Sequence, residues 1–275
     1  MTTKSKPTSR NVTPGDIKRY LDDALHTVDI YKRWIAGAPY MLADTKPYLM
    51  CVLMHASLDY SRAMLKLLRD DPVEFCAVGP ALLRPQIETF IRAGWIYFNA
   101  EEAQVTEFLR NDKLRRRKHK DGQRVPSSNP FNGENLDDFL DLKNTMSISA
   151  IAQALEGKLR EEGLEIDLAA YVEREDRMPN GLWAGLNGLL HGGNILLKLY
   201  MADDSPLPTI GTGPQFTNTV VTTSISVDLA FKSAGLVGHA VRDNSPTRKE
   251  ALVNAMISFR SRHDALMARL THNLH

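Results

Sequence analysis

Two apolar segments of the sequence each carry a stripe of polar residues at helical spacing. In the first, Arg84, Glu88 and Arg92 recur every four residues, which places them on one face of a helix. The second stripe, in residues 182–200, consists of Asn187, His191, Asn194 and Lys198. If both faces turn inward, the stripes meet in a polar seam, where a charge without a partner costs several kcal/mol. We therefore take His191, Arg84, Glu88 and Arg92 as the candidate catalytic residues. In such a seam the charged side chains would need one another or a ligand as partners.

A third segment places His55, Asp59 and Arg62 on one helical face. A carboxylate one turn from a histidine can fix the tautomer of the imidazole and raise its pKa, as a general acid or base requires. The same spacing is also typical of a solvated helix surface with weak ion pairs. We take this stripe, together with Asn187 and Asn194, as a secondary set of candidates.

The most basic part of the chain is a short run near residue 115. Its members are Lys113, Arg115, Arg116, Arg117 and Lys118, followed by Lys120 and Arg124. Such a run can contact phosphates through charge alone. It can equally be the solvated end of a helix, where positive charge is favourable. The whole chain has 34 basic and 33 acidic residues, so its net charge of +1 argues against a dedicated nucleic-acid binder.

Other common kinds of catalytic site lack their motifs in this sequence. The eight histidines are scattered and no Cys-x-x-Cys or His-Glu-x-x-His is present, so we expect no metal site. Neither a Gly-x-Ser-x-Gly motif nor a Gly-rich phosphate loop occurs, and we expect no cofactor. Cys51 and Cys76 lie in apolar surroundings, which is typical of buried thiols in a reducing compartment.

Apolar residues recur at helical spacing along most of the chain. The expected helices cover residues 13–38, 46–69, 80–99, 101–119, 135–143, 147–162, 167–176, 182–200 and 217–241, with a last helix from Pro246. Residues 219–227 are also rich in Val, Thr and Ile, which favour strands, but a lone strand would have no partner. We therefore expect helix there. Helix 80–99 is apolar on most sides, as buried helices are.

These patterns predict an all-α fold, a single multi-helix bundle without a second domain. Residues 1–12 would form a flexible tail and residues 13–275 the bundle. Within it, residues 113–134 would form an insertion, a basic helix end followed by an exposed loop rich in Gly, Pro and Ser.

The composition is that of a soluble globular protein, with 43% hydrophobic and 24% charged residues. We see no uninterrupted apolar window long enough for a membrane span. The first residues carry Lys and Arg without the apolar stretch of a secretory signal. We therefore expect a cytoplasmic protein that contacts no membrane.

The segment from Arg84 to Trp95, with the sequence RPQIETFIRAGW, resembles part of a set of uncharacterised bacterial all-helical domains. In these domains an Arg-Pro-x-x-Glu helix is followed much later by a helix with a His-Gly pair, which His191 and Gly192 match. The resemblance covers roughly residues 45–270. These domains are similar to the HEPN group of helical bundles, many of which occur in toxin–antitoxin and phage-defence systems.

Active HEPN members are metal-independent ribonucleases with an Arg-x4-6-His motif. In that motif the histidine is the general acid and base on the RNA 2′-hydroxyl, and the arginine stabilises phosphate charge. The resemblance therefore implies an HEPN-like protein that binds or acts on RNA in a stress or defence setting, and a homodimer. His191 has no arginine four to six residues before it, so it would have to pair in space with Arg84 or Arg92.

Two other functions are compatible with the same residues. The protein could be a non-catalytic helical module that binds a protein partner, with Arg84, Glu88 and Arg92 in a buried structural network. It could also bind a small anionic molecule in a pocket with Trp95, Tyr97 and Trp183 in its walls. The sequence leaves open whether the protein is an enzyme.

Overall fold

The computed structural model confirms the all-α fold class. It describes residues 12–38, 45–72, 78–101, 148–172, 216–243 and 245–272, together with residues 75 and 105. Within these residues every regular element is a helix and none is a strand.

The described helices agree closely with those expected from the sequence. They are α1 (Pro14–Ala36), α2 (Thr45–Asp70), α3 (Val78–Ala81), α4 (Leu83–Phe98), α7 (Ile148–Glu161), α8 (Ala169–Val172), α11 (Phe216–Ala240) and α12 (Pro246–His272). The expected helix 80–99 is divided at Leu82 into α3 and α4. The tail, the 113–134 insertion and the expected helices 135–143 and 182–200 lie outside the described residues, as does nearly all of 101–119.

The start of α1 is fixed by a capping box between Thr13 and Asp16. The Asp16 N–H donates to the Thr13 hydroxyl, and the Thr13 N–H donates to the Asp16 carboxylate at 2.9 Å. Pro14 supplies the first helical residue, where its missing N–H costs nothing. The inner face of α1 then buries Ile17, Leu21 and other apolar side chains at helical spacing.

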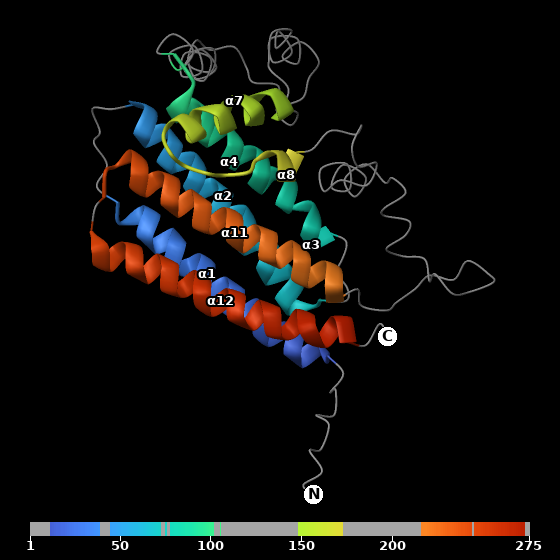
Figure 1. Cartoon of the computed structure of the whole chain (residues 1–275). Helices are drawn as coiled ribbons and strands as arrows, with labels where there is room; N and C mark the ends of the chain where they lie inside the picture. The colour runs from blue at the N-terminus through green and yellow to red at the C-terminus, as the bar shows by residue number, and fades with distance from the viewer. Residues whose placement is uncertain are drawn as a thin grey trace, which may run out of the picture.

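The long helices run side by side, as Figure 1 shows. α1 packs against α2, α11 and α12, and α2 packs in turn against α4 and α11. α7 covers α4 and contacts the short α8. One apolar core links all of these helices, so the candidate polar stripes on α2 and α4 have fixed positions relative to each other.

α11 is the central helix of this packing and corrects one expectation from the sequence. Its residues Asn218–Ala240 are long and apolar enough to cross a membrane by length and composition, although we expected no such window from the sequence. Of this window, 56% is buried against other helices of the protein. Such burial is typical of the core helix of a soluble protein, which passes the same test of length and composition.

Close contact between α11 and α1 depends on Gly238. A Cβ atom at this position would lie 2.7 Å from the Trp34 ring. α11 ends soon afterwards, where Arg242 adopts a left-handed backbone with φ 52° and the Asp243 N–H donates to the Gly238 carbonyl.

Candidate functional site

The first predicted stripe lies on the partly exposed face of α4. Arg84 Nε and Glu88 Oε1 form an ion pair at 3.2 Å, and their side chains are 25% and 29% exposed. Arg92 is exposed. These charged groups keep contact with water in the described structure, which avoids the desolvation cost of a buried seam.

The partner stripe falls in a part of the chain that the structure does not describe. This holds for His191, Asn187 and Asn194, and also for the basic run Lys113, Arg115, Arg116, Arg117 and Lys118. The meeting of His191 with Arg84 or Arg92 therefore stays a prediction.

The buried polar residue of α4 is Gln86, which the sequence reasoning missed. Its amide nitrogen donates to the Ser226 carbonyl at 2.9 Å, and its amide oxygen accepts from the Ser226 hydroxyl at 2.7 Å. The Ser61 and Ser226 hydroxyls lie 2.7 Å apart, and Ser57 donates to the Gln86 carbonyl. All four residues are fully buried and uncharged, so this network joins α2, α4 and α11 without the desolvation cost of ions.

The second predicted stripe is part of a row of ion pairs between α1 and α2. The pairs are Asp22 with Arg69 at 2.7 Å, Asp29 with Arg62 at 2.6 Å, and Lys32 with Asp59. Successive pairs are seven and then three residues apart on α1, and they are separated by the same numbers of residues in the reverse direction on α2. This register is that of two antiparallel helices with charged edges, which sequence spacing alone could have indicated.

A groove lies beside this row of pairs. Its volume is about 330 Å³, and it is lined by Asp29, Lys32, Arg33, Ala36, His55 and Arg62. His55 Nδ1 lies 3.6 Å from Asp59 Oδ2, and the His55 side chain is 37% exposed. The exposed Arg33 makes no side-chain hydrogen bond or ion pair with any residue that the structure describes. The α1–α2 groove therefore combines an accessible imidazole with one positive charge that its neighbours leave unbalanced.

A second ionic cluster, which sequence reasoning did not find, joins α8 to α11 and α12. The Tyr171 hydroxyl donates to Asp228 at 2.6 Å, and Lys232 Nζ lies 2.5 Å from the Tyr171 oxygen and 2.8 Å from Asp228. Arg260 completes the cluster at 2.9 Å from the other Asp228 oxygen. Only the spacing of Asp228 and Lys232 was visible in the sequence, since Tyr171 and Arg260 come from distant elements.

This cluster has the electrostatics of a structural tie. Burial acts to raise the pKa of Asp228, but hydrogen bonds from Lys232 and Tyr171 and the nearby positive charges outweigh it and lower the pKa overall. Burial, followed by the adjacent Asp228 charge, raises the pKa of Tyr171 far above its usual range. A tyrosine that stays protonated in this way cannot serve as a base at neutral pH, so we assign the cluster a role in packing.

The remaining candidate groups in the described residues favour no other chemistry. No set of three or more His, Cys, Asp or Glu residues among them could hold a metal ion. Cys51 is buried, and burial raises the pKa of its thiol to about 11, which makes it a poor nucleophile. Of the three aromatic residues of the expected anion pocket, Trp95 packs with Ile96, Tyr97 lines a different hollow, and Trp183 is not described.

No protein-family model, curated protein or solved structure matches this chain.

Proposed function

We propose that this is an HEPN-like helical protein of the bacterial cytoplasm that binds RNA through its phosphates in a stress or defence setting. Two observations support the proposal. The segment from Arg84 to Trp95 carries the family-like Arg-Pro-x-x-Glu pattern on a helix, and the α1–α2 groove offers a suitable surface for a phosphodiester. The groove carries the proposal, because its residues are described in full.

The chemistry of the groove suits a phosphodiester anion. The Arg33 guanidinium has no partner among the described residues, whereas the charges of Lys32 and Arg62 are offset by Asp59 and Asp29, respectively, so Arg33 supplies the net positive charge of the groove. His55 lies at the same groove and can exchange a proton with a ribose hydroxyl. The arrangement brings an arginine and a histidine together from two helices, where active HEPN members have them in one short motif.

Binding of labelled single-stranded RNA to the purified protein tests the first part of this proposal. We expect Arg33→Ala to weaken binding and to reduce the magnitude of the slope of log affinity against log salt concentration by about one, the effect of losing one phosphate contact. Arg69→Ala is the matched control, because Arg69 belongs to the same row of ion pairs but does not line the groove. Equal binding by wild type and Arg33→Ala would exclude the groove as the RNA site.

Cleavage is tested separately, by incubation of the protein with the same labelled RNA in the presence of EDTA. Loss of cleavage in His55→Ala would assign catalysis to the groove, whereas loss in His191→Ala alone would assign it to the stripe with Arg84 and Arg92. Failure of every preparation to cleave would leave an RNA-binding protein without this activity. The His55→Ala variant should keep the melting temperature of the wild type, because the His55 side chain is 37% exposed.

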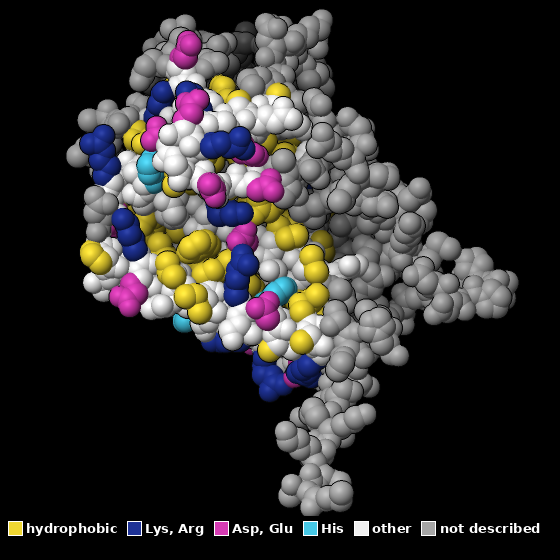
Figure 2. Space-filling view, in the orientation of Figure 1, with side chains coloured by type: hydrophobic (Ala, Val, Ile, Leu, Met, Phe, Trp, Pro, Cys, Tyr) yellow, Lys and Arg dark blue, Asp and Glu magenta, His cyan; other side chains and the backbone are white. Residues whose placement is uncertain are grey.

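A non-catalytic interaction module is the second candidate function. Figure 2 shows hydrophobic side chains gathered across α11 and α12 in the middle of one face. Among the exposed residues, Val253 and Ile257 lie one turn apart on α12, and Ile257 is 62% exposed. An exposed apolar patch of this kind favours a protein partner, for which a second copy of the chain is the simplest choice. Light scattering of wild type and Ile257→Glu should then give a dimer and a monomer, respectively.

A further inference from the structure

A second hollow lies at the end of the molecule where α2 begins and where α4 and α11 end (Figure 1). It has a volume of about 290 Å³, and it is lined by Lys46, Pro47, Tyr97, Phe98, Glu162 and His239. It shares no lining residue with the α1–α2 groove, and no prediction from the sequence included it. We call it the helix-end hollow.

Aromatic rings build one wall of the helix-end hollow. Phe98 stacks on the His239 imidazole with ring centres 5.9 Å apart, and Tyr97 meets Phe98 edge to face at 4.7 Å. These contacts hold the three rings in place while leaving them in the lining. The hollow therefore offers a positioned aromatic wall to a ligand, beside the polar side chains that make up the rest of its lining.

The part of the lining next to His239 attracts positive charge. Glu162 directly follows the end of α7, and the carboxyl-terminal ends of α4 and α11 lie at Phe98 and His239. Each of these helix ends carries partial negative charge that adds to the Glu162 carboxylate. Glu162 lies 3.8 Å from His239 Nε2, which is too long for a hydrogen bond, and its side chain is 55% exposed. Its oxygens are therefore accessible to an ammonium group of a ligand.

Lys46 supplies the complementary charge on the same hollow. Its ammonium group donates to the Ala100 carbonyl just beyond α4, which fixes its position. An ammonium group has three N–H donors, so other donors of Lys46 can reach a ligand carboxylate. The lining thus holds one accessible carboxylate and one positioned ammonium group beside an aromatic wall.

We propose that the helix-end hollow binds a free α-amino acid with an apolar or aromatic side chain. The ligand ammonium contacts Glu162, the ligand carboxylate contacts Lys46, and the side chain packs on Tyr97 and Phe98. The volume lies at the small end of the range for ligand pockets, roughly 300–1,000 Å³, which suits a metabolite of this size better than a nucleotide. This inference does not depend on RNA binding at the α1–α2 groove.

Calorimetric titration of the full chain with L-phenylalanine and L-leucine tests the proposal. Two analogues of phenylalanine separate the charges, since 3-phenylpropionate lacks the ammonium group and phenethylamine lacks the carboxylate. We expect an amino acid to bind, and each analogue to bind at least about tenfold more weakly, the usual effect of losing one hydrogen bond to a charged group. Absence of binding by both amino acids up to about 10 mM, or equal binding by the analogues, would overturn the proposal.

Two variants assign the binding to the hollow. Glu162→Gln should lower the affinity for the amino acid about tenfold and reduce the discrimination against 3-phenylpropionate. Glu161→Gln is the matched control, because Glu161 pairs with Lys158 and does not line the hollow. Lys46→Met should weaken the binding of the amino acid but not that of phenethylamine, which has no carboxylate, and so tests the contact with Lys46. The melting temperature of the variant is measured to check that it folds. Equal losses in Glu162→Gln and Glu161→Gln would contradict the assignment.

Discussion

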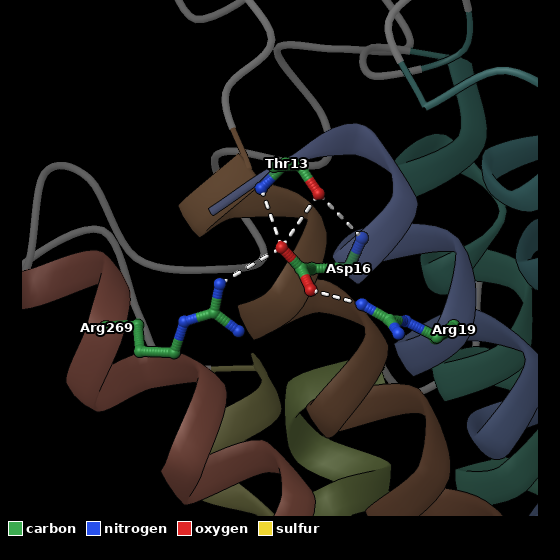
Figure 3. Close-up of polar contacts among 4 residues, drawn as sticks. All are labelled: Thr13, Asp16, Arg19 and Arg269. Carbon is green, nitrogen blue, oxygen red and sulfur yellow. Dashed lines mark hydrogen bonds and ion pairs between the residues drawn. The ribbon is translucent and has the colours of Figure 1, made fainter. Parts of the chain in front are cut away.

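Asp16 ties the beginning of the chain's first helix to the end of its last helix, as Figure 3 shows. One carboxylate oxygen accepts from the Thr13 N–H at 2.9 Å, the Thr13 hydroxyl at 2.8 Å and Arg269 at 3.0 Å. The other oxygen accepts from Arg19 at 2.6 Å. The Thr13 N–H bond is the largest cause that lowers the pKa of Asp16 far below its usual range, followed by the bond from Arg269.

We predict that Asp16→Asn destabilises the protein at pH 7 by about 1–2 kcal/mol, the range for losing a helix cap. A carboxylate whose pKa is lower in the folded protein contributes its stability above the unfolded pKa, near 3.8, and loses that contribution as the pH falls below it. The difference between variant and wild type should therefore stay constant above about pH 5 and shrink steadily as the pH falls from about 4 towards the much lower pKa of the folded state. Urea unfolding at several pH values measures it.

Asp22→Asn is the control for the Asp16 prediction. Asp22 also pairs with an arginine of another helix, Arg69, but both side chains are about half exposed, so we expect a change below about 0.5 kcal/mol. Similar losses in the two variants would contradict a special role for Asp16 and would suggest that any charge on α1 contributes equally.

At the scale of the elements, the described helices could be predicted well wherever the sequence contains both an apolar stripe and a cap. Thr13 and Pro14 mark the start of α1, and Pro246 marks that of α12, so both starts are found correctly. α11 was harder to interpret because its Val, Thr and Ile residues also favour a strand, although the helix predicted over 217–241 is confirmed.

Sequence reasoning did not find the buried polar contacts of α4. It singled out the charged residues Arg84, Glu88 and Arg92 and left open whether they are buried, whereas the structure buries the neutral Gln86 with serines of α2 and α11. Spacing reveals which residues share a face of a helix but not which face is buried. Gln86 is two residues from Arg84 and from Glu88, so it lies on a different face from them. The cost of burying charge, which favours neutral groups inside, is a better guide than the apolar character of the surrounding helix.

We predict that Ser226→Ala destabilises the protein by about 1–3 kcal/mol, because it leaves the Gln86 amide oxygen and the Ser61 hydroxyl without this partner. Ser233→Ala in the same helix is the control, since the hydrogen bond that the buried Ser233 hydroxyl makes among the described residues goes to the Leu229 carbonyl one turn earlier. A loss in Ser233→Ala as large as in Ser226→Ala, by thermal or urea unfolding, would contradict the role assigned to the buried network of Gln86, Ser61 and Ser226.

We also predict opposite effects for two glycines of α11. Gly238→Ala should destabilise the protein by about 1–3 kcal/mol, because the new methyl group meets the rigid Trp34 ring, although alanine favours the helix itself. Gly235→Ala should stabilise it by up to about 1 kcal/mol, since Gly235 is exposed and a Cβ there meets nothing within 4 Å. Urea midpoints of the two variants compare them directly, and a stabilised Gly238→Ala would mean that α1 and α11 can separate slightly without cost.

At the scale of the whole molecule, antiparallel pairing of charged helix edges recurs around α1. Asp16 of α1 pairs with Arg269 of α12, and Asp23 pairs with Arg262, so the two pairs are seven residues apart on both helices. Two of the pairs between α1 and α2, Asp22 with Arg69 and Asp29 with Arg62, have the same spacing. Such matched steps can be read from a sequence once two helices are assumed to be neighbours. The choice of neighbours depends on tertiary packing, which is why the α1–α2 groove and the helix-end hollow could not be located from the sequence.

The segment that contains α7 and α8 is attached to the rest of the molecule in two ways. α7 packs on α4, where a Cβ at Gly94 would lie 2.7 Å from Leu155, and Tyr171 is bound to Asp228 and Lys232 of α11. Because the lining of the helix-end hollow includes Glu162 from this segment, the attachment also affects the proposed ligand site. The strength of the Tyr171 contact therefore matters for both stability and binding.

We predict that Tyr171→Phe loosens this segment while leaving α1 and α12 unchanged. Removing the hydroxyl deletes its hydrogen bonds with Asp228 and Lys232, and the loss of one bond to a charged partner is already worth about 1.5–3 kcal/mol, so amides of Ile148–Glu161 should exchange with solvent at least roughly tenfold faster. Tyr60→Phe is the control, because Tyr60 is 38% exposed and contributes no such tie. Hydrogen exchange read by mass spectrometry separates the helices. Faster exchange throughout the protein would mean that α7 opens only when the whole molecule unfolds, and unchanged exchange would mean that the packing of α7 on α4 is sufficient without the Tyr171 contact.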